Sequence, residues 1–273
     1  MFNRIYIEIT NICNLNCDFC PHTERIKKSM TLEEFERVIL KIKDYTNHIY
    51  LHVKGEPLMH KELDGILKIA SKYNLNVNIT TNARLLKEKI DIINNNKVRQ
   101  LNISLHSFNS LDEIKDLLNV LDNINNSYIS LRLWNNKDNS KIYDILEKHY
   151  NKKIDFVGKR FTITDKIYLD KDILFEWPDI KREVITTCGT CKGAKSQLAI
   201  LVDGTVVPCC LDNDGIINLG NIFDSSLEEI LSTKRYKDMI DGFNNNKLTE
   251  ELCQKCGYRN RFKRGVKWLK KQE

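Results

Sequence analysis

The sequence lacks the segments that would place a protein in or across a membrane. No stretch of its 273 residues approaches the roughly 18 consecutive apolar residues that a membrane-spanning helix needs. The first residues, Met1 to Glu8, have neither the apolar core nor the small-residue cleavage site of a secretory signal peptide. No repeat of about 20 to 50 residues occurs beyond a strand-and-helix unit, which excludes a solenoid. We therefore expect a cytoplasmic protein with no membrane partner.

An excess of one charge is also absent from most of the chain. Apolar residues make up 41% and charged residues 29%, which excludes a disordered, collagen-like or coiled-coil chain. The whole net charge of +6 lies in the last 17 residues, Gly257 to Glu273. Such a tail can attract nucleic acid, but a solvated terminus is the simpler interpretation, so nucleic acid is not an expected partner. The length fits two domains, or one barrel with an appendage.

Cysteine is the residue that the sequence has in unusual number. The nine cysteines fall into tight groups: Cys13, Cys17, Cys20, Cys188, Cys191, Cys209, Cys210, Cys253 and Cys256. A disulfide framework is typical of small exported domains, whereas this chain is large, has an odd number of cysteines and shows no export signal. Thiolates at such spacings in a reducing compartment more often bind a metal ion or an iron-sulfur cluster.

Short apolar segments alternate with amphipathic helical patterns over residues 4–169. The pattern predicts strands over 4–10, 48–53, 76–81, 100–106, 128–134 and 166–169. Helices are predicted over about 31–44, 61–73, 85–94, 110–124 and 141–150, the first of them capped by Thr31 with Glu34 three residues on. This alternation indicates an α/β fold whose parallel strands are joined by right-handed crossovers.

The alternation ends near Asp170. Residues 170–187 have no clear pattern, and Phe175 and Trp177 within them are candidates to line or cover a site. The following segment contains a hairpin pattern, 197–202 and 205–207 around Asp203-Gly204, and then a helix over about 226–243. We expect three parts: 1–169, a connector over 170–187, and a small cysteine-rich α+β part over 188–273.

The first cysteine group, Cys13, Cys17 and Cys20, follows the first predicted strand directly. Asparagines and Pro21 favour a loop here, and a loop can wrap around a cluster. Three thiolates on a four-iron cluster leave one iron open to bind and activate another molecule. The alternative is a structural zinc site completed by His22.

The spacing Cys-x3-Cys-x2-Cys, with Phe19 before the last cysteine, resembles the radical S-adenosylmethionine superfamily. Lys54-Gly55-Glu56-Pro57 resembles that family's Gly-Gly-Glu motif, with Lys54 in place of the first glycine. Thr81-Asn82-Ala83 is similar to its Thr-Asn-Gly turn, and Ser104 falls in a segment that lies near the ribose in the family. The resemblance implies a partial (β/α)6 barrel of the TIM type and an enzyme.

The resemblance also implies a chemistry and its cofactors. S-adenosylmethionine binds the open iron of a [4Fe-4S] cluster held by Cys13, Cys17 and Cys20, and its reductive cleavage gives a 5'-deoxyadenosyl radical that abstracts a substrate hydrogen. Gly55, Glu56, Asn82 and Ser104 are the implied cofactor-binding residues. Arg132 is a further candidate, because a cation on that strand can pair with the methionine carboxylate, although a structural ion pair is equally compatible.

The second group resembles the SPASM/twitch extension of the same superfamily. Because no cysteine follows Cys256, the shorter twitch form is expected, with one auxiliary [4Fe-4S] cluster that relays electrons. The implied ligands are Cys191, Cys209, Cys253 and Cys256. A zinc site built from Cys188, Cys191, Cys253 and Cys256 is the alternative, although the gap between the two pairs is wide for one.

Two further residues are candidate catalytic groups. Cys210 occupies a position where related enzymes carry a base, and its thiol is a candidate hydrogen-atom donor; packing is the alternative. Asp212 is a candidate proton acceptor in an oxidation, or else a turn residue, as is Asp214.

Three possible functions remain open. Oxidation of a small molecule is favoured, because the first strand begins at about residue 4 and leaves no room for a precursor-recognition domain. Peptide maturation or epimerisation is the second possibility, and a non-catalytic iron-sulfur or RNA-binding protein is the third. The chemistry also requires a flavodoxin- or ferredoxin-like electron donor.

Overall fold

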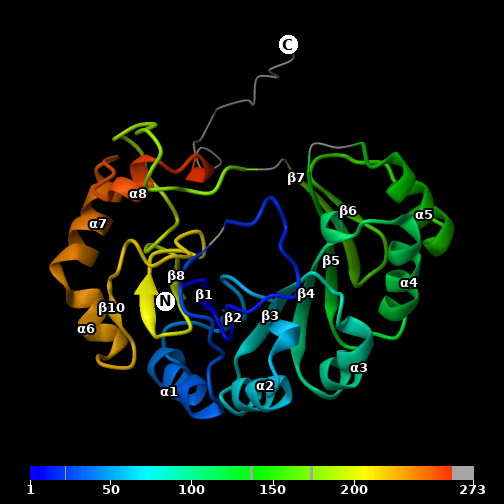
Figure 1. The fold of residues 1–273 in the computed structure, drawn as a ribbon, viewed down its shortest axis with the longest axis horizontal. Helices are drawn as coiled ribbons and strands as arrows, with labels where there is room; N and C mark the ends of the chain where they lie inside the picture. The colour runs from blue at the N-terminus through cyan, green and yellow to red at the C-terminus, as the bar shows by residue number, and fades with distance from the viewer. Residues whose placement is uncertain (22, 136–137, 173–174, 260–273) are drawn as a thin grey trace.

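The structure is a computed structural model, and it describes residues 1–21, 23–135, 138–172 and 175–259. His22 and the basic residues beyond Arg259 lie outside these ranges. Ten strands in the described residues form one sheet in the order β10-β9-β8-β1-β2-β3-β4-β5-β7-β6. Figure 1 shows the sheet as a curved inner layer with the helices around its outside.

Six parallel strands confirm the predicted partial barrel. They are β1 (Arg4–Ile7), β2 (His48–Tyr50), β3 (Asn76–Thr81), β4 (Val98–Ser104), β5 (Tyr128–Trp134) and β7 (Ile167–Asp172). Parallel strands have their carboxyl ends at the same edge of the sheet, so the loops after β1, β3, β4 and β5 meet at that edge. This edge carries the first cysteine group and most of the predicted cofactor-binding residues.

The helices that connect these strands agree with the predicted ranges to within a few residues. They are α1 (Leu32–Ile42), α2 (Leu63–Lys72), α3 (Leu86–Asn95), α4 (Leu111–Leu121) and α5 (Ser140–Tyr150), with single turns η1 (Pro57–Met59) and η2 (Leu105–Ser107). Thr31 caps α1 as predicted: its hydroxyl accepts from the Glu34 N–H, and the Glu34 carboxylate accepts from the Thr31 N–H. The apolar side of α1 is completely buried against the sheet.

The C-terminal part continues the same sheet, which the sequence pattern did not predict. Strand β8 (Gln197–Ile200) pairs parallel to β1, and the predicted hairpin is confirmed by the antiparallel pairing of β8 with β9 (Thr205–Val207). Strand β10 (Gly220–Asn221) completes this edge. The two predicted domains therefore share strand neighbours, as the adjoining β1 and β8 in Figure 1 show.

The predicted helix over 226–243 is wrong as a single element. Thr233 has an extended backbone (φ −61°, ψ 150°), so the segment forms α6 (Leu227–Ser232) and α7 (Lys234–Asn244). The Thr233 hydroxyl accepts from the Tyr236 N–H and caps α7, because threonine competes for backbone donors at such positions. A short helix, α8 (Glu251–Gln254), precedes the last cysteine.

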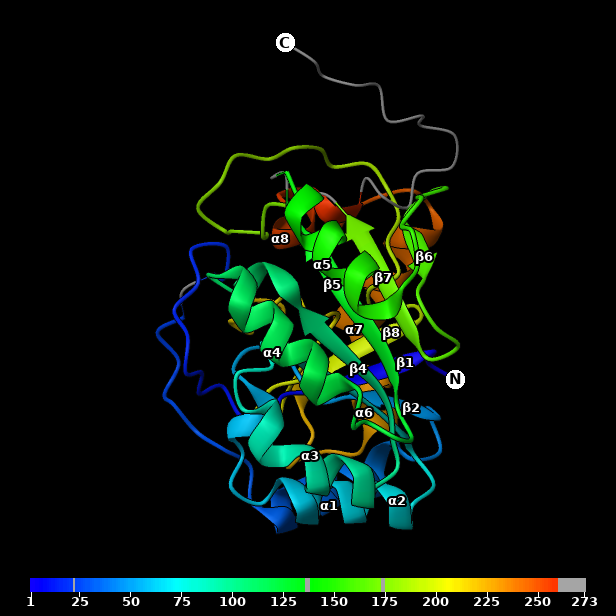
Figure 2. The same ribbon diagram turned by 90° about the vertical axis from the view of Figure 1, so that its right-hand side faces the viewer.

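The predicted connector also begins later than expected. Strand β7 extends to Asp172, because its last two residues pair with Leu133 and Trp134 of β5. The pattern also missed β6 (Arg160–Thr162), which pairs antiparallel with β7. Residues 175–187 contain no helix or strand and pass along the upper side of the molecule in Figures 1 and 2. No helix within the described part of the chain is long and apolar enough to span a bilayer.

Candidate functional site

Both cysteine groups open into one cavity inside the partial barrel. The cavity has a volume of about 1100 Å³ and is lined from the strands β1 to β5, from the connector and from the C-terminal part. Phe175 and Trp177 pack together with ring centroids 5.4 Å apart, and Tyr258 packs on Phe175 at 4.8 Å. All three rings line the cavity, as expected for the first two, so the connector supplies part of its wall.

The loop that carries the first cysteine group is closed at its base by Asn11. This side chain donates to the Ile26 carbonyl at 2.8 Å and accepts from the Lys28 N–H at 2.8 Å. A backbone bridge between Thr10 and Ser29 lies beside it. The segment between these contacts therefore leaves the sheet and returns to it as one closed loop, which is how an irregular segment is held in a fixed shape.

The three thiols of this loop interact with one another. Burial raises the pKa of Cys13 and of Cys17, and the nearby thiol of Cys20 raises both further. In the described residues, no three Cys, His, Asp or Glu side chains converge closely enough to bind a single metal ion. A cubane cluster suits such a spacing, because each of its thiolate ligands binds a different iron atom.

The Glu56 carboxylate holds the turn after β3 in place through hydrogen bonds. One oxygen accepts from the Thr81 hydroxyl at 2.6 Å and from the Leu58 N–H at 3.0 Å, and the other accepts from the Asn82 N–H at 2.7 Å. The side chain is buried, and burial raises its pKa. Both oxygens therefore hold backbone or hydroxyl donors of this turn in place.

The turn that Glu56 holds joins β3 to the cysteine loop. The Asn82 amide donates to the Asn14 side chain at 2.8 Å and lies 3.9 Å from the Cys13 sulfur. Ala83 has a left-handed backbone (φ 59°), which explains why glycine suits this position in the related motif. Asn82 therefore lies at the first cysteine group, where the sequence predicted it.

Ser104 and Arg132 are direct neighbours across β4 and β5. Both line the cavity, and the Arg132 guanidinium lies over the Trp134 ring, 4.9 Å from its centroid. Burial lowers the pKa of Arg132. The pair thus places a hydroxyl and a cation side by side at the carboxyl edge of the sheet.

Lys54, which replaces a glycine of the related motif, reaches the first cysteine group. Its ammonium nitrogen lies 3.3 Å from the Cys20 sulfur and donates to the Pro21 carbonyl. Its backbone N–H donates to the Glu8 carboxylate at 3.0 Å. The sequence motif gave no indication of this contact, because Lys54 and Cys20 lie on different loops.

Glu8 is the second residue that sequence reasoning missed. It is completely buried, and its carboxylate also accepts from Arg25 at 2.6 Å and from the Val202 N–H at 3.0 Å. A buried carboxylate with charged and backbone donors ties the cysteine loop, the barrel and the C-terminal part together. An acidic residue inside an apolar strand is the signal that would have found it.

The second cysteine group is half-buried at the other side of the cavity. Its four members are Cys191, Cys209, Cys253 and Cys256. Burial raises the pKa of all four thiols, and it is the largest contribution in each case. Neighbouring thiols of the group raise the pKa of the last three further. The predicted ligands therefore lie together, and bound metal would replace their protons.

Arg259 places a buried positive charge beside the second cysteine group. Its side chain is buried and donates to the Cys188 carbonyl at 3.2 Å, whereas its buried Nε and Nη2 atoms have no hydrogen-bond partner within residues 1–259 as far as the structure describes them. The guanidinium lies near Cys191 and Cys256 and lowers the pKa of both. Four thiolates on a cluster would give this buried cation a counter-charge.

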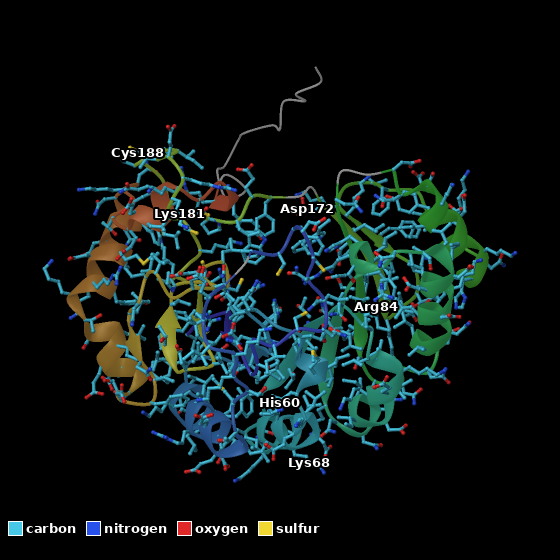
Figure 3. The ribbon with its side chains drawn as sticks, in the orientation of Figure 1. His60, Lys68, Arg84, Asp172, Lys181 and Cys188 are labelled. Carbon is cyan, nitrogen blue, oxygen red and sulfur yellow. The ribbon has the colours of Figure 1, made fainter. Side chains whose placement is uncertain are left out.

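Cys188 and Cys210 lie in different environments. Cys188 is exposed at the periphery, where Figure 3 labels it, which does not favour the zinc site that included it. Cys210 packs against Tyr6, Val53 and Ala199 and lines the cavity. Burial raises its pKa to about 11, partly offset by a hydrogen bond with Tyr6, so the thiol keeps its proton near neutral pH.

Asp212 is used by the fold. Its two oxygens accept from the N–H groups of Ile216 and Ile217 at 2.9 and 2.8 Å, and burial raises its pKa to about 6. These bonds close the turn that precedes β10. The turn-residue interpretation thus accounts for both oxygens, and Asp214 is exposed.

Comparison with known families agrees with this arrangement. A model of the radical SAM superfamily matches residues 7–135, and a model of the SPASM iron-sulfur cluster-binding domain matches residues 191–257. The chain belongs to the radical SAM superfamily and carries a C-terminal SPASM domain. It is therefore a radical SAM enzyme that works with S-adenosylmethionine and iron-sulfur clusters.

The individual relatives have low sequence identity to this chain or cover only part of it. A GTP 3',8-cyclase of Clostridium botulinum (strain Okra / Type B1) is 24% identical over 281 residues, which cover 82% of this chain and 86% of the relative. A GTP 3',8-cyclase of Peptoclostridium acidaminophilum is 33% identical over 114 residues, 39% of this chain and 35% of the relative.

Solved structures share the fold at low identity. BtrN in complex with AdoMet and 2-DOIA has a TM-score of 0.64 at 18% identity, covering 94% of this chain and 93% of BtrN. Streptococcus suis SuiB bound to S-adenosylmethionine has a TM-score of 0.63 at 17% identity, covering 93% of this chain and 70% of SuiB.

Proposed function

We propose that this enzyme oxidises a small molecule held in the cavity between its two cysteine groups. The observation that carries the proposal is that both groups line one cavity, so a substrate can face a radical source on one side and an electron acceptor on the other. BtrN, which was crystallised with AdoMet and 2-DOIA, supports a small substrate because this chain covers 93% of its length.

The first group holds the cofactor that starts the reaction. Cys13, Cys17 and Cys20 would bind a [4Fe-4S] cluster through three irons. When bound, the cluster and S-adenosylmethionine supply an electron and a 5'-deoxyadenosyl radical that takes a hydrogen atom from the substrate. The protein's part is to orient these groups and exclude water.

The residues around this group would position S-adenosylmethionine. The backbone at Gly55 and Glu56 would meet its amino group, and the Glu56 carboxylate would keep the turn at Asn82 in place. Ser104 would lie near the ribose. Arg132 would pair with the methionine carboxylate, because no carboxylate of the described residues forms an ion pair with it.

The second group would hold an auxiliary [4Fe-4S] cluster through Cys191, Cys209, Cys253 and Cys256. Four protein thiolates saturate a cluster, so this one would accept the second electron of the oxidation and would not bind substrate. Arg259 would offset its negative charge. A flavodoxin- or ferredoxin-like protein in the cytoplasm would supply the first electron.

Peptide maturation or epimerisation is the second candidate, and Cys210 is the observation that favours it. Its half-buried, protonated thiol lines the cavity and can donate a hydrogen atom to a substrate radical. SuiB has also been crystallised with its precursor peptide SuiA. A Cys210→Ala variant that keeps both clusters and full turnover would remove this candidate.

The central test compares the anaerobically reconstituted wild type with a Cys13→Ala, Cys17→Ala, Cys20→Ala triple variant. Two four-iron clusters predict about eight irons in the wild type and about four in the variant. Formation of 5'-deoxyadenosine after reduction should be lost in the variant only. About four irons with bound zinc in the wild type would overturn the auxiliary cluster, and absence of S-adenosylmethionine cleavage in the wild type would overturn the radical reaction.

A further inference from the structure

The walls of the cavity carry a strong excess of positive charge. Among the described residues that line it, eight are arginine or lysine and only two, Glu56 and Asp212, are acidic. Both carboxylates already accept hydrogen bonds from backbone N–H groups. A cavity with one sign of charge and low-dielectric walls attracts ligands of the opposite sign.

Several of these cations have a partner or a proposed one. Arg160 forms two hydrogen bonds, of 2.6 and 2.9 Å, with Asp170. Lys54 contacts the first cysteine group, Arg259 lies near the second, and Arg132 is assigned to S-adenosylmethionine. Of the remaining four, Lys27, Arg99 and Lys192 are exposed. Arg4, at the start of β1, is half-buried and forms no ion pair with a carboxylate of the described residues.

Arg4 is held in place by neutral groups. Its guanidinium lies over the Tyr50 ring, 5.2 Å from the centroid, and the Tyr6 hydroxyl lies nearby. No carboxylate of the described residues forms an ion pair with it. A half-buried guanidinium that is oriented by aromatic rings but not neutralised keeps its charge available to a ligand.

Polar groups that can also bind a ligand surround Arg4. The Tyr6 ring packs against Tyr50 and His52, with centroids 5.1 and 5.4 Å away. The Nδ1 atom of His52 is buried and has no hydrogen-bond partner among the described residues. Cys210 packs on this group from the C-terminal part. We call Arg4, Tyr6, Tyr50 and His52 the Arg4 subsite.

We propose that the Arg4 subsite binds an anionic oxygen group of the substrate, a carboxylate or a phosphate, and that the enzyme therefore acts on a small anionic molecule. The guanidinium would form two hydrogen bonds with the anion, and the phenols and imidazole would complete its shell. This inference rests on the proposed function, because it assumes that the cavity is the substrate site. It adds the chemical class of the substrate.

The test measures anion binding apart from turnover. Inorganic phosphate and acetate are titrated separately into the reconstituted enzyme saturated with S-adenosylmethionine, under argon, by isothermal titration calorimetry. The wild type should bind at least one of them, and the affinity of the two distinguishes phosphate from carboxylate chemistry. Arg4→Met should weaken binding about tenfold or more, and Arg4→Lys should weaken it less because it keeps the charge but not the planar fork.

Arg99→Met is the matched control, because Arg99 lines the same cavity but donates to Asn78 at 3.0 Å. It should leave anion binding unchanged. Equal affinity in the wild type and in Arg4→Met, or no binding of either anion by the wild type, would overturn the subsite. Iron content and S-adenosylmethionine affinity verify that each variant has assembled its clusters. If Arg4→Met loses its clusters, the anion affinity of Arg4→Lys is compared with that of Arg99→Lys, and equal affinities would overturn the subsite.

The same samples separate this inference from the proposed function. Formation of 5'-deoxyadenosine is measured without any substrate. Anion binding without cleavage would leave the subsite standing and remove the radical reaction. Cleavage of S-adenosylmethionine without Arg4-dependent anion binding would leave the radical reaction standing and remove the subsite.

Discussion

Replacing Lys54 should make the first cluster harder to reduce. The Lys54 ammonium lies 3.3 Å from the Cys20 sulfur, a ligand of the proposed cluster. A cation at this distance stabilises the reduced cluster more than the oxidised one, because reduction adds a negative charge. Lys54→Met removes the charge and keeps most of the side-chain length, and Lys54→Gly restores the residue typical of the related motif.

The size of the effect follows from the geometry. Two unit charges 3.3 Å apart interact by about 5 kcal/mol at an effective dielectric constant of about 20. The added electron is spread over the whole cluster and Lys54 is half-exposed, so about 1 to 2 kcal/mol should remain, in line with a charge-assisted hydrogen bond. At about 59 mV per factor of ten for one electron, the midpoint potential should fall by about 45 to 85 mV.

The assay is a redox titration followed by EPR. It is performed in a Cys253→Ala, Cys256→Ala background, so that only the first cluster contributes to the signal. Lys27→Met is the control, because Lys27 lines the same cavity but is exposed and has no contact with a cysteine among the described residues. An unchanged midpoint potential in Lys54→Met, or an equal change in Lys27→Met, would refute the reasoning.

Two further substitutions test the supports of the site. Gly55→Ala should abolish S-adenosylmethionine binding, because a Cβ at this left-handed position (φ 75°) would lie 2.3 Å from the Thr10 carbonyl oxygen. The control is Gly158→Ala, which also has a left-handed backbone (φ 96°) but has open space around it, and it should bind S-adenosylmethionine normally in calorimetry. Normal binding by Gly55→Ala would contradict the proposed role of Gly55. Glu8→Gln should lower the free energy of unfolding by about 3 to 5 kcal/mol in anaerobic urea titrations, because it leaves the largely buried Arg25 without its counter-charge. The control is Glu36→Gln, because Glu36 is half-exposed and its partner Lys72 is largely exposed, so this variant should change the free energy of unfolding little. An equal effect of both variants would exclude the proposed role of Glu8.

Local patterns made most of the barrel predictable. The Thr31 cap, the apolar side of α1 and the strands β3 and β5 follow from residue spacing, because each depends on neighbours within one element. The cysteine loop was predictable for a similar reason, since three thiols within eight residues leave few alternatives. The predicted grouping of Cys191 with Cys253 depended on the family resemblance.

What the sequence hid depends on contacts between distant segments. The break at Thr233 lies in an otherwise helical pattern, and the strand β6 is too short and polar to give a signal. The Lys54 contact with Cys20 and the packing of Arg4 on Tyr50 arise only when segments far apart in the sequence meet. Neither could be found from spacing, because the partners are not periodic neighbours.

The pairing of β1 with β8 has a consequence for synthesis of the chain. The ribosome releases β1 early, but the strand that covers its edge, and the Val202 N–H that meets Glu8 from 194 residues away, come much later. Until then β1 exposes unpaired N–H and C=O groups, which invite association with other chains. Closing contacts of such long sequence separation is also slow. A protein truncated before residue 197 should therefore aggregate, and cluster insertion should follow completion of the C-terminal part.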